Sequence, residues 1–373
     1  MAAANSYSAP VDLASFGNSG RDERFELFPA YSGFAQSPLL DETETGYDPE
    51  TLNEHWEQRA PPPVSIYSLA NYECWSVGLL LRAHEPFLAD DVYPEYIDPR
   101  FDLLPEVWAG SLREPAPREI RADAPVSAVL HPNLVYGHFL LEMLPRIYLM
   151  GVLRDLGLQF GILQPSALPG WVTAFLDLLV PDSNRVLYDA KRDFIRAPAI
   201  IAPSMMHRRY AYHPAFNLLV AAMLRRCGVP LAGPPPNRRI YVSRTRNRPG
   251  WHVMTNEAEI ERAMSDAGLE IIHPQELDLG EQIKVFSQAA LIVGQYSSAL
   301  HNALFAPAGA TVIALNRVNW YQSMIARLRR HRLAFIKPRD GVFRNWRLRA
   351  RGDAAFAIDP QEVARVLRLA GQS

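Results

Sequence analysis

The feature that most constrains the fold is an alternation of two kinds of segment between Arg239 and Leu315. Short apolar segments rich in β-branched residues are typical of buried parallel strands. The longer segments between them place apolar residues at helical spacing. Strands joined by helices form right-handed βαβ units, so the sequence predicts a Rossmann-like domain with a parallel sheet covered on both faces. The predicted strands are 239–243, 270–273, 290–293 and 311–315, and the predicted helices are 256–267 and 279–289.

A tight turn, Gly294 to Ser298, follows the predicted strand 290–293. Ser297 or Ser298 is a good N-cap for a further helix, which Pro307 ends. At the carboxyl edge of a parallel sheet, a helix that begins directly after a strand turns free N–H groups and the positive end of its dipole toward the same point. The sequence therefore predicts an anion or nucleotide-phosphate site at this turn.

Three arginines, Arg244, Arg246 and Arg248, follow the first strand of this domain. They lie at the edge where open α/β sheets bind ligands. Because a guanidinium group matches the oxygens of a phosphate, Ser243 and Arg244 are candidates for a pyrophosphate clamp. The alternative is a solvated, arginine-rich surface loop.

Composition limits the class of protein. The chain has 373 residues, is 48% hydrophobic, and can therefore bury the cores of two domains. The first 20 residues lack the pattern of a signal or an anchor, and no segment reaches the about 20 apolar residues of a membrane-spanning helix. Two cysteines, Cys74 and Cys227, lie outside any metal-ligand spacing, so we expect neither a disulfide nor a cysteine-bound metal, and a reducing compartment fits best.

Prolines and glycines interrupt helices and strands, and their positions divide the chain into five predicted regions. We expect an irregular segment at 1–60, an α/β domain at 61–228, a stiff linker at 229–237, the Rossmann-like domain at 238–345, and a tail with a helix at 346–373. Residues 1–120 hold 21 acidic and 7 basic residues, a local balance of −14 that leaves +12 for the rest of the net −2.

The basic run 327–351 contains ten Arg or Lys residues and one Asp. It is a candidate surface for an anionic membrane or an anionic glycan acceptor. Since it lacks the aromatic interleaving of a single-strand nucleic-acid groove, we expect no nucleic-acid partner. We expect the protein in the cytoplasm, and peripheral contact with the inner membrane face stays open.

A second candidate site lies in the segment before the linker. A predicted strand at 128–130 leads through a loop into a helix that carries His138 and Glu142, four residues apart and therefore on one face. An imidazole beside a carboxylate near a loop can act as a general base. The alternative is a surface pair that orders the first turn of the helix. Zinc is disfavoured because no third ligand lies at a suitable spacing.

Several short motifs, in this order along the chain, resemble glycosyltransferase family 61, the capsular polysaccharide biosynthesis type. They span 138–315 and are His138-Phe139-Leu140-Leu141-Glu142, Leu144-Pro145-Arg146, Ile240-Tyr241-Val242-Ser243-Arg244, Asn256-Glu257, Glu281-Gln282, Gly294 to Ser298, Leu300 and Asn302-Ala303-Leu304-Phe305.

The resemblance implies a GT-B-like fold, in which two Rossmann-like domains face each other across a cleft. It also implies inverting transfer from a nucleotide sugar to a glycan or lipid-linked glycan acceptor in capsular or exopolysaccharide synthesis, without a cofactor or a metal. Glu142, oriented by His138, is then the candidate base. The candidate donor-binding residues are Ser243, Arg244, Arg248, Glu257, Gln282, Gly294, Tyr296, Ser297, Ser298 and Asn302.

This sequence departs from the family pattern at the central turn. The family commonly has His and Gly where Tyr296 and Ser297 stand, and its helix acid, here Glu142, is often Asp. A tyrosine donates a hydrogen bond or stacks on a ring, but it carries no positive charge. The alternative function is therefore a catalytically idle nucleotide- or glycan-binding subunit of a polysaccharide assembly complex. No dinucleotide or triphosphate loop and no nucleophile elbow is present in the sequence.

Overall fold

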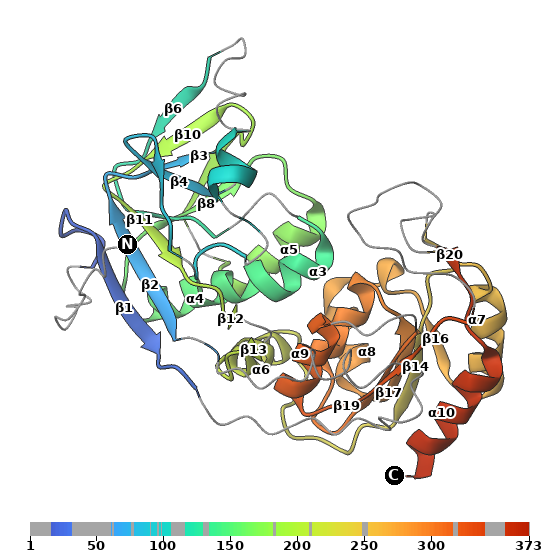
Figure 1. The fold of residues 1–373 in the computed structure, drawn as a ribbon. Coiled ribbons are helices and arrows are strands. Elements are labelled where there is room, and N and C mark those ends of the chain that lie inside the picture. Colours follow the sequence, from blue (N-terminus) through green and yellow to red (C-terminus); the bar gives the residue numbers. More distant parts are fainter. Residues whose placement is uncertain are drawn as a thin grey trace. The chain divides into compact units, whose positions relative to one another are not determined.

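A computed structural model describes residues 16–31, 61, 63–75, 78–89, 91–94, 97, 99–105, 116–129, 134–181, 184–208, 211–247, 253–315, 320–339 and 355–372. These residues form a mixed α/β structure with several sheets, which confirms the predicted α/β class (Figure 1). They divide into two compact units, one holding the described residues up to 208 and the other those from 211 onward.

The second unit contains the predicted parallel sheet. Its five strands lie in the order β16-β14-β17-β18-β19, and every neighbouring pair is parallel. The bounds are β14 Arg238–Val242, β16 Glu270–Ile272, β17 Ala289–Gln295, β18 Thr311–Leu315 and β19 Arg332–Ile336. All four predicted strands of this domain are confirmed, and β17 is longer than predicted.

Helices cover both faces of this sheet. On one face, α7 and α10 pack on the side chains of Tyr241, Val293 and Ile313, which belong to one apolar cluster. The alternate residues of the same strands, among them Ile240 and Ile292, are buried on the other face, where α6, η4, α8 and α9 pack together. The bounds are α6 Phe216–Arg226, α7 Glu257–Asp266, η3 Pro274–Glu276, α8 Leu279–Ser287, η4 Ser298–Phe305, α9 Trp320–Arg329 and α10 Pro360–Gln372.

The division between the units falls ahead of the linker predicted at 229–237. Helix α6 contacts α8, α9 and η4, so it belongs to the second unit and not to the domain predicted at 61–228. The segment 229–237 has no helix or strand, and most of its residues are exposed. It connects α6 to β14 within one unit. Strands β15 Val253–Met254 and β20 Ala355–Phe356 pair in parallel beside the main sheet, and β13 Ala211–Tyr212 precedes α6.

The first unit differs from a simple Rossmann-like domain. Its six-stranded sheet, in the order β1-β2-β11-β7-β8-β9, is parallel from β11 to β9 but antiparallel at β1, β2 and β11. The second sheet, β5-β4-β3-β10-β6, is mostly antiparallel. The second Rossmann-like domain that the resemblance implies is therefore wrong in detail, because the short strands at 73–86 form hairpins, which βαβ units do not contain.

Strand β1 corrects a further prediction, that of an irregular segment at 1–60, because its residues pair with β2. The strands of the first unit are β1 Glu23–Phe28, β2 Val64–Ala70, β3 Glu73–Trp75, β4 Leu79–Arg82, β5 Glu85–Pro86, β6 Arg118–Arg121, β7 Val126–Ser127, β8 Gly161–Pro165, β9 Arg185–Tyr188, β10 Asp193–Arg196, β11 Ala199–Pro203 and β12 His207–Arg208. The helices are η1 Pro99–Leu103, α3 Tyr136–His138, η2 Phe139–Met143, α4 Leu144–Asp155 and α5 Gly170–Leu179.

The basic run 327–351 is described only up to 339. Within that part, the guanidinium group of Arg329 donates to Asn217 Oδ1 at 2.6 Å and to the Ala306 carbonyl at 3.1 Å. Arg332 donates to Thr311 Oγ1 at 2.7 Å. These two cations are therefore engaged by contacts within the second unit, and the role of the run 327–351 as a candidate surface for a membrane or a glycan stays a prediction.

Candidate functional site

The order of strands in the second unit determines where a ligand binds. When the five strands are numbered by their place in the chain, their order across the sheet is 2-1-3-4-5. The connection after β14 leads to its neighbour β16 on one side, whereas the connection after β17 leads to β18 on the other side. Ligands of open α/β sheets bind at this switch point, beyond the carboxyl ends of the two strands. Val242 is paired with Gly294 at the ends of β14 and β17. The loop from Ser243 and the turn from Tyr296 therefore leave the sheet at neighbouring positions.

Two carboxylates of helix α7 fix the loop after β14. Glu257 accepts a hydrogen bond from the Arg244 backbone N–H at 2.6 Å, and Glu261 accepts one from the Thr245 hydroxyl at 2.7 Å. The buried Ser243 hydroxyl also donates to Glu261. Because the two glutamates are four residues apart, they lie on one face of α7 and hold adjacent parts of the loop.

The electrostatics of these two glutamates differ. Burial raises the pKa of Glu257, and the hydrogen bond from Arg244 only partly offsets that effect. Burial also acts to raise the pKa of Glu261, but the hydrogen bonds from Ser243 and Thr245 outweigh it, so the net shift is downward. The loop is thus stabilised by charge-assisted hydrogen bonds at an edge where the half-buried side chain of Arg244 carries a positive charge.

Gly294 has a packing role at the end of β17. A Cβ atom there would lie 3.0 Å from Val242 Cβ, 3.2 Å from the Val242 carbonyl oxygen and 3.4 Å from Leu300 Cδ1. The missing side chain lets β17, the end of β14 and the next helix approach closely. Gly294 therefore shapes the predicted donor site by permitting this packing.

The helix predicted after the turn is present as a 3-10 helix, η4. Ser297 occupies the N-cap position, but its side chain makes no capping hydrogen bond, which corrects the predicted cap. The Leu300 N–H donates to the Ser297 carbonyl at 3.0 Å. The N–H groups of Ser298 and Ala299 lie ahead of this hydrogen bond, at the start of the helix. Donors for an anion are thus still available to this edge from the start of η4.

Two further predicted donor residues, Gln282 and Asn302, contact each other. The buried Asn302 side chain donates to Gln282 Oε1 at 3.3 Å, and Gln282 Nε2 donates to the Leu277 carbonyl at 3.1 Å. This chain of hydrogen bonds connects η4 to α8. Their observed role is to fix the position of η4, and hence of the turn before it.

A row of rings lies beside the turn, and the sequence prediction did not include most of it. The ring centroids of Tyr296 and His301 are 5.8 Å apart, and those of His301 and Tyr321 are 5.7 Å apart. Trp320 stacks on Tyr321 at 3.7 Å. The signal available in the sequence was the aromatic pair Trp320-Tyr321, which comes shortly after the strand 311–315. That strand is the neighbour of β17 in the sheet, so the pair follows it at the same edge. Aromatic rings in such a place can stack on a base or a sugar.

The second candidate site, His138 and Glu142, lies in the first unit. His138 Nδ1 is 2.8 Å from Glu142 Oε1, as the four-residue spacing predicts. Glu142 has 0% exposed surface, whereas the His138 side chain is 26% exposed, so the alternative of a surface pair is wrong for Glu142. A buried carboxylate held by a partly exposed imidazole is an arrangement suited to proton transfer.

A π-helical turn positions Glu142. The helix from Tyr136 to Asp155 widens over Phe139–Met143, directly before Pro145. Proline has no N–H to donate and its ring crowds the carbonyl one turn earlier, so a wider turn accommodates it. Such turns are frequent at functional sites. The sequence contains Pro145 as a signal, but helical periodicity alone does not predict the extra residue in this turn.

Arg146 fixes this helix to the sheet of the first unit. Its guanidinium group donates to the carbonyls of Pro203, Val129 and Ala128 at 3.0, 3.3 and 3.2 Å. Burial lowers its pKa to about 10, with nearby acidic groups acting in the opposite direction. Arg146 therefore has a structural role in the first unit, and it stabilises the position of the turn that carries Glu142.

Arg248 lies outside the described residues. Within the part of the chain that the structure covers, no cluster of three or more His, Cys, Asp or Glu side chains could hold a metal ion. No described helix is long and apolar enough to cross a membrane.

The comparison with protein families gives one match. The model of the family described as Glycosyltransferase 61 matches residues 136–313. No curated protein matches the chain. The matched region begins at the helix that carries His138 and Glu142, and it includes the loop after β14 and the turn after β17. Residues 136–313, slightly less than half of the chain, therefore match glycosyltransferase family 61, and this match supports glycosyltransferase activity.

Proposed function

We propose that the protein is an inverting, metal-independent glycosyltransferase with a GT-B arrangement. It transfers a sugar from a nucleotide-sugar donor to a glycan or lipid-linked glycan acceptor in cell-surface polysaccharide synthesis, in the cytoplasm or at the inner membrane face. The observation that carries the proposal is the switch point at β14 and β17, where Arg244 and the start of η4 follow neighbouring strand ends. Both the cation and the N–H groups favour a diphosphate there.

Arg244 and the N–H groups of the turn bind the donor diphosphate in this proposal. Glu257 and Glu261 hold the loop by its backbone and hydroxyl groups, so the Arg244 guanidinium group is directed by a fixed backbone. A preorganised cation stabilises the negative charge that develops on the leaving diphosphate, which is the task that a metal ion performs in other transferases. Arg248 is proposed to assist it.

Glu142 serves as the general base. Its buried carboxylate takes the proton of the acceptor hydroxyl, and His138 keeps one carboxylate oxygen oriented at 2.8 Å. The acceptor oxygen forms a bond to the anomeric carbon while the bond to the diphosphate breaks on the opposite side, which inverts the configuration. General-base catalysis of this kind contributes about 10²-fold to 10⁴-fold to the rate.

A calorimetric titration tests the donor site. UDP, GDP, CMP and TDP are titrated into the native protein and into Arg244→Ala, with EDTA present throughout. We expect one nucleotide to bind, and the substitution to weaken its binding by about 2 kcal/mol, the value of a charge-assisted hydrogen bond. Arg246→Ala is the matched control, because Arg246 is exposed in the same loop and donates to Glu276 at 2.7 Å. Equal affinity of native protein and Arg244→Ala would refute this site.

Turnover tests the base. Glu142→Gln keeps the shape of the side chain but cannot accept the proton, so we expect turnover to fall by about 100-fold or more while nucleotide affinity stays unchanged. His138→Ala is expected to have a smaller effect, since it removes only the orienting partner. Near-native turnover of Glu142→Gln would exclude this residue as the base.

The second candidate function is a catalytically idle subunit that binds a nucleotide or glycan. The observation that favours it is Tyr296, which stands where the family commonly has His and therefore brings no positive charge to the turn. Slow hydrolysis of a nucleotide sugar by the native protein, absent from Glu142→Gln, would speak against this alternative. Nucleotide binding without any hydrolysis or transfer would favour it.

A further inference from the structure

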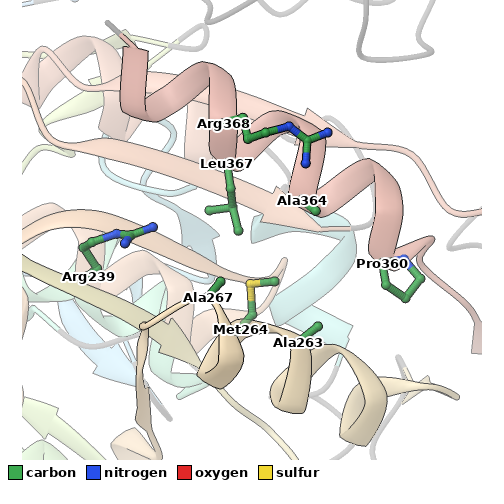
Figure 2. A pocket seen from close by; sticks show the side chains of 8 residues that line it. All are labelled: Arg239, Ala263, Met264, Ala267, Pro360, Ala364, Leu367 and Arg368. Atoms are coloured by element: carbon green, nitrogen blue, oxygen red, sulfur yellow. The ribbon is translucent and has the colours of Figure 1, made fainter.

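A groove on the second unit lies between helices α7 and α10, on the face of the sheet away from η4 (Figure 2). Its volume is about 370 Å³, which lies within the range of small-molecule sites. Six of the eight lining residues are apolar and the other two are arginines. They are Ala263, Met264 and Ala267 of the α7 region, Pro360, Ala364, Leu367 and Arg368 of α10, and Arg239 of β14.

The apolar floor of the groove comes from two long side chains. Met264 of α7 and Leu367 of α10 are buried, and Figure 2 shows them pointing toward each other between the two helices, where they close the bottom of the groove. The alanines of both helices leave the space above Met264 and Leu367 open, because their methyl groups are too short to span the gap between the helices. From Pro360 to Arg368 the groove follows nine residues of α10, over which the helix rises by about 12 Å.

The two arginines of the groove differ from their neighbours in the chain. Arg238 donates to Glu270, and Arg365 donates to Glu362 at 3.0 Å. Arg239 and Arg368 are both exposed, and neither makes a hydrogen bond or an ion pair with any residue that the structure describes. The groove therefore combines apolar walls with two cations that no described residue of the unit pairs.

The groove is separate from the proposed donor site. Arg239 lies near the start of β14, and Ser243 follows its other end. Helix α7 starts near the carboxyl edge of the sheet and ends near the amino edge, so Ala267 lies at the same edge as Arg239 (Figure 2). Arg368 lies in the second half of α10, far along the helix from Pro360. The cations thus gather toward one end of the groove, and the other end is apolar.

We propose that this groove binds a single-chain lipid phosphate. The phosphate contacts Arg239 and Arg368, and the hydrocarbon chain lies between α7 and α10 against Ala263, Ala267 and Ala364, which are at least partly exposed. A ligand with one anionic end and one apolar end matches both halves of the groove, whereas a neutral chain leaves the arginines without a counter-charge and a free phosphate leaves the apolar walls exposed. This site is independent of the donor site and gives the second unit a contact for lipid.

Binding of dodecyl phosphate below its micellar concentration tests this proposal. We expect saturable binding to the native protein that weakens by about tenfold or more in Arg239→Ala and in Arg368→Ala. Ala364→Phe and, separately, Ala263→Leu fill the groove from its two walls and are expected to abolish binding. Arg365→Ala is the matched control on α10, because Arg365 is paired with Glu362 and does not line the groove. We expect native affinity from this control.

Two further ligands test the contributions of the phosphate and of the hydrocarbon chain separately. Inorganic phosphate is expected not to compete, and dodecyl maltoside, with a neutral headgroup, is expected to bind at least about tenfold more weakly. Circular dichroism of each variant checks that it folds. Absence of saturable binding, equal binding of dodecyl maltoside, effective competition by inorganic phosphate, or native affinity in both filling variants would overturn the proposal.

Discussion

His331 is expected to make the second unit sensitive to acid. It has 0% exposed surface and lies between α9 and β19, with Nε2 3.4 Å from the carbonyl of Ala306, the residue that follows η4. Burial, aided by the positive charge of Arg329, lowers its pKa from 6.5 to about 3. The folded protein therefore keeps this imidazole neutral at pH values where an unfolded chain would protonate it.

The sign and size of the effect follow from this shift. Between pH 6.5 and pH 3 the unfolded state binds the proton and the folded state does not, so the free energy of unfolding decreases as the pH falls through this window. One unit of pKa corresponds to about 1.4 kcal/mol. The loss is therefore about 2 kcal/mol at pH 5 and about 3 kcal/mol at pH 4, and it is close to zero at pH 7.

The substitution His331→Gln removes the titrating group and keeps a polar side chain of similar size. We expect it to lower stability at pH 7, and its deficit relative to the native protein to shrink by about 2 kcal/mol between pH 7 and pH 5. Urea unfolding at both pH values measures this, with hydrogen exchange in β18 and β19 reporting on the second unit. His84→Asn, at an exposed histidine of the first unit, is the control. A deficit that is equal at the two pH values would refute the reasoning.

Three other substitutions test the contacts around the candidate sites. Arg146→Met leaves three buried carbonyls without their donor and is expected to destabilise the first unit by about 3–5 kcal/mol, measured by urea unfolding. Gly294→Ala brings a Cβ atom to 3.0 Å from Val242 and 3.4 Å from Leu300, so we expect a loss of about 1–3 kcal/mol in the same assay, and a native melting temperature would contradict the packing role. Glu261→Gln replaces two charge-assisted hydrogen bonds by neutral ones, and calorimetry is expected to show nucleotide affinity weakened by about tenfold, while unchanged affinity would show that the loop holds its shape without this charge.

The sequence predicted the second unit well because its local signals and its packing agree. Each predicted strand there is short, apolar and followed by a helix, and the parallel sheet requires that pattern. Asp278 and Glu281 form a capping box at the start of α8, a local signal that the prediction of this helix did not use. The order of the strands also places Ser243 and Tyr296 at one edge, as the prediction assumed. The functional roles of these residues stay predictions.

The features that the sequence did not predict depend on contacts between distant segments. Helix α6 has the amphipathic pattern of any surface helix, and only its packing on α8 and α9 assigns it to the second unit. The burial of Glu142 depends on the widened turn before Pro145. Glu261 belongs to no motif of the sequence, and it acts on the site only because α7 packs beside the end of β14.

The contacts within each unit predict which substitutions change donor affinity and which change turnover. The loop after β14 is held by Glu257 and Glu261, both of α7, so a nucleotide finds a site that one unit has already ordered. Glu142, the proposed base, is held by its own helix through His138. With the proposed roles, substitutions at Arg244 or Glu261 act mainly on donor affinity, whereas substitutions at Glu142 act on turnover. A base acts on the acceptor, so its substitution is not expected to change the binding of a free nucleotide. A Glu142 variant with native turnover and weaker nucleotide binding would therefore contradict this assignment.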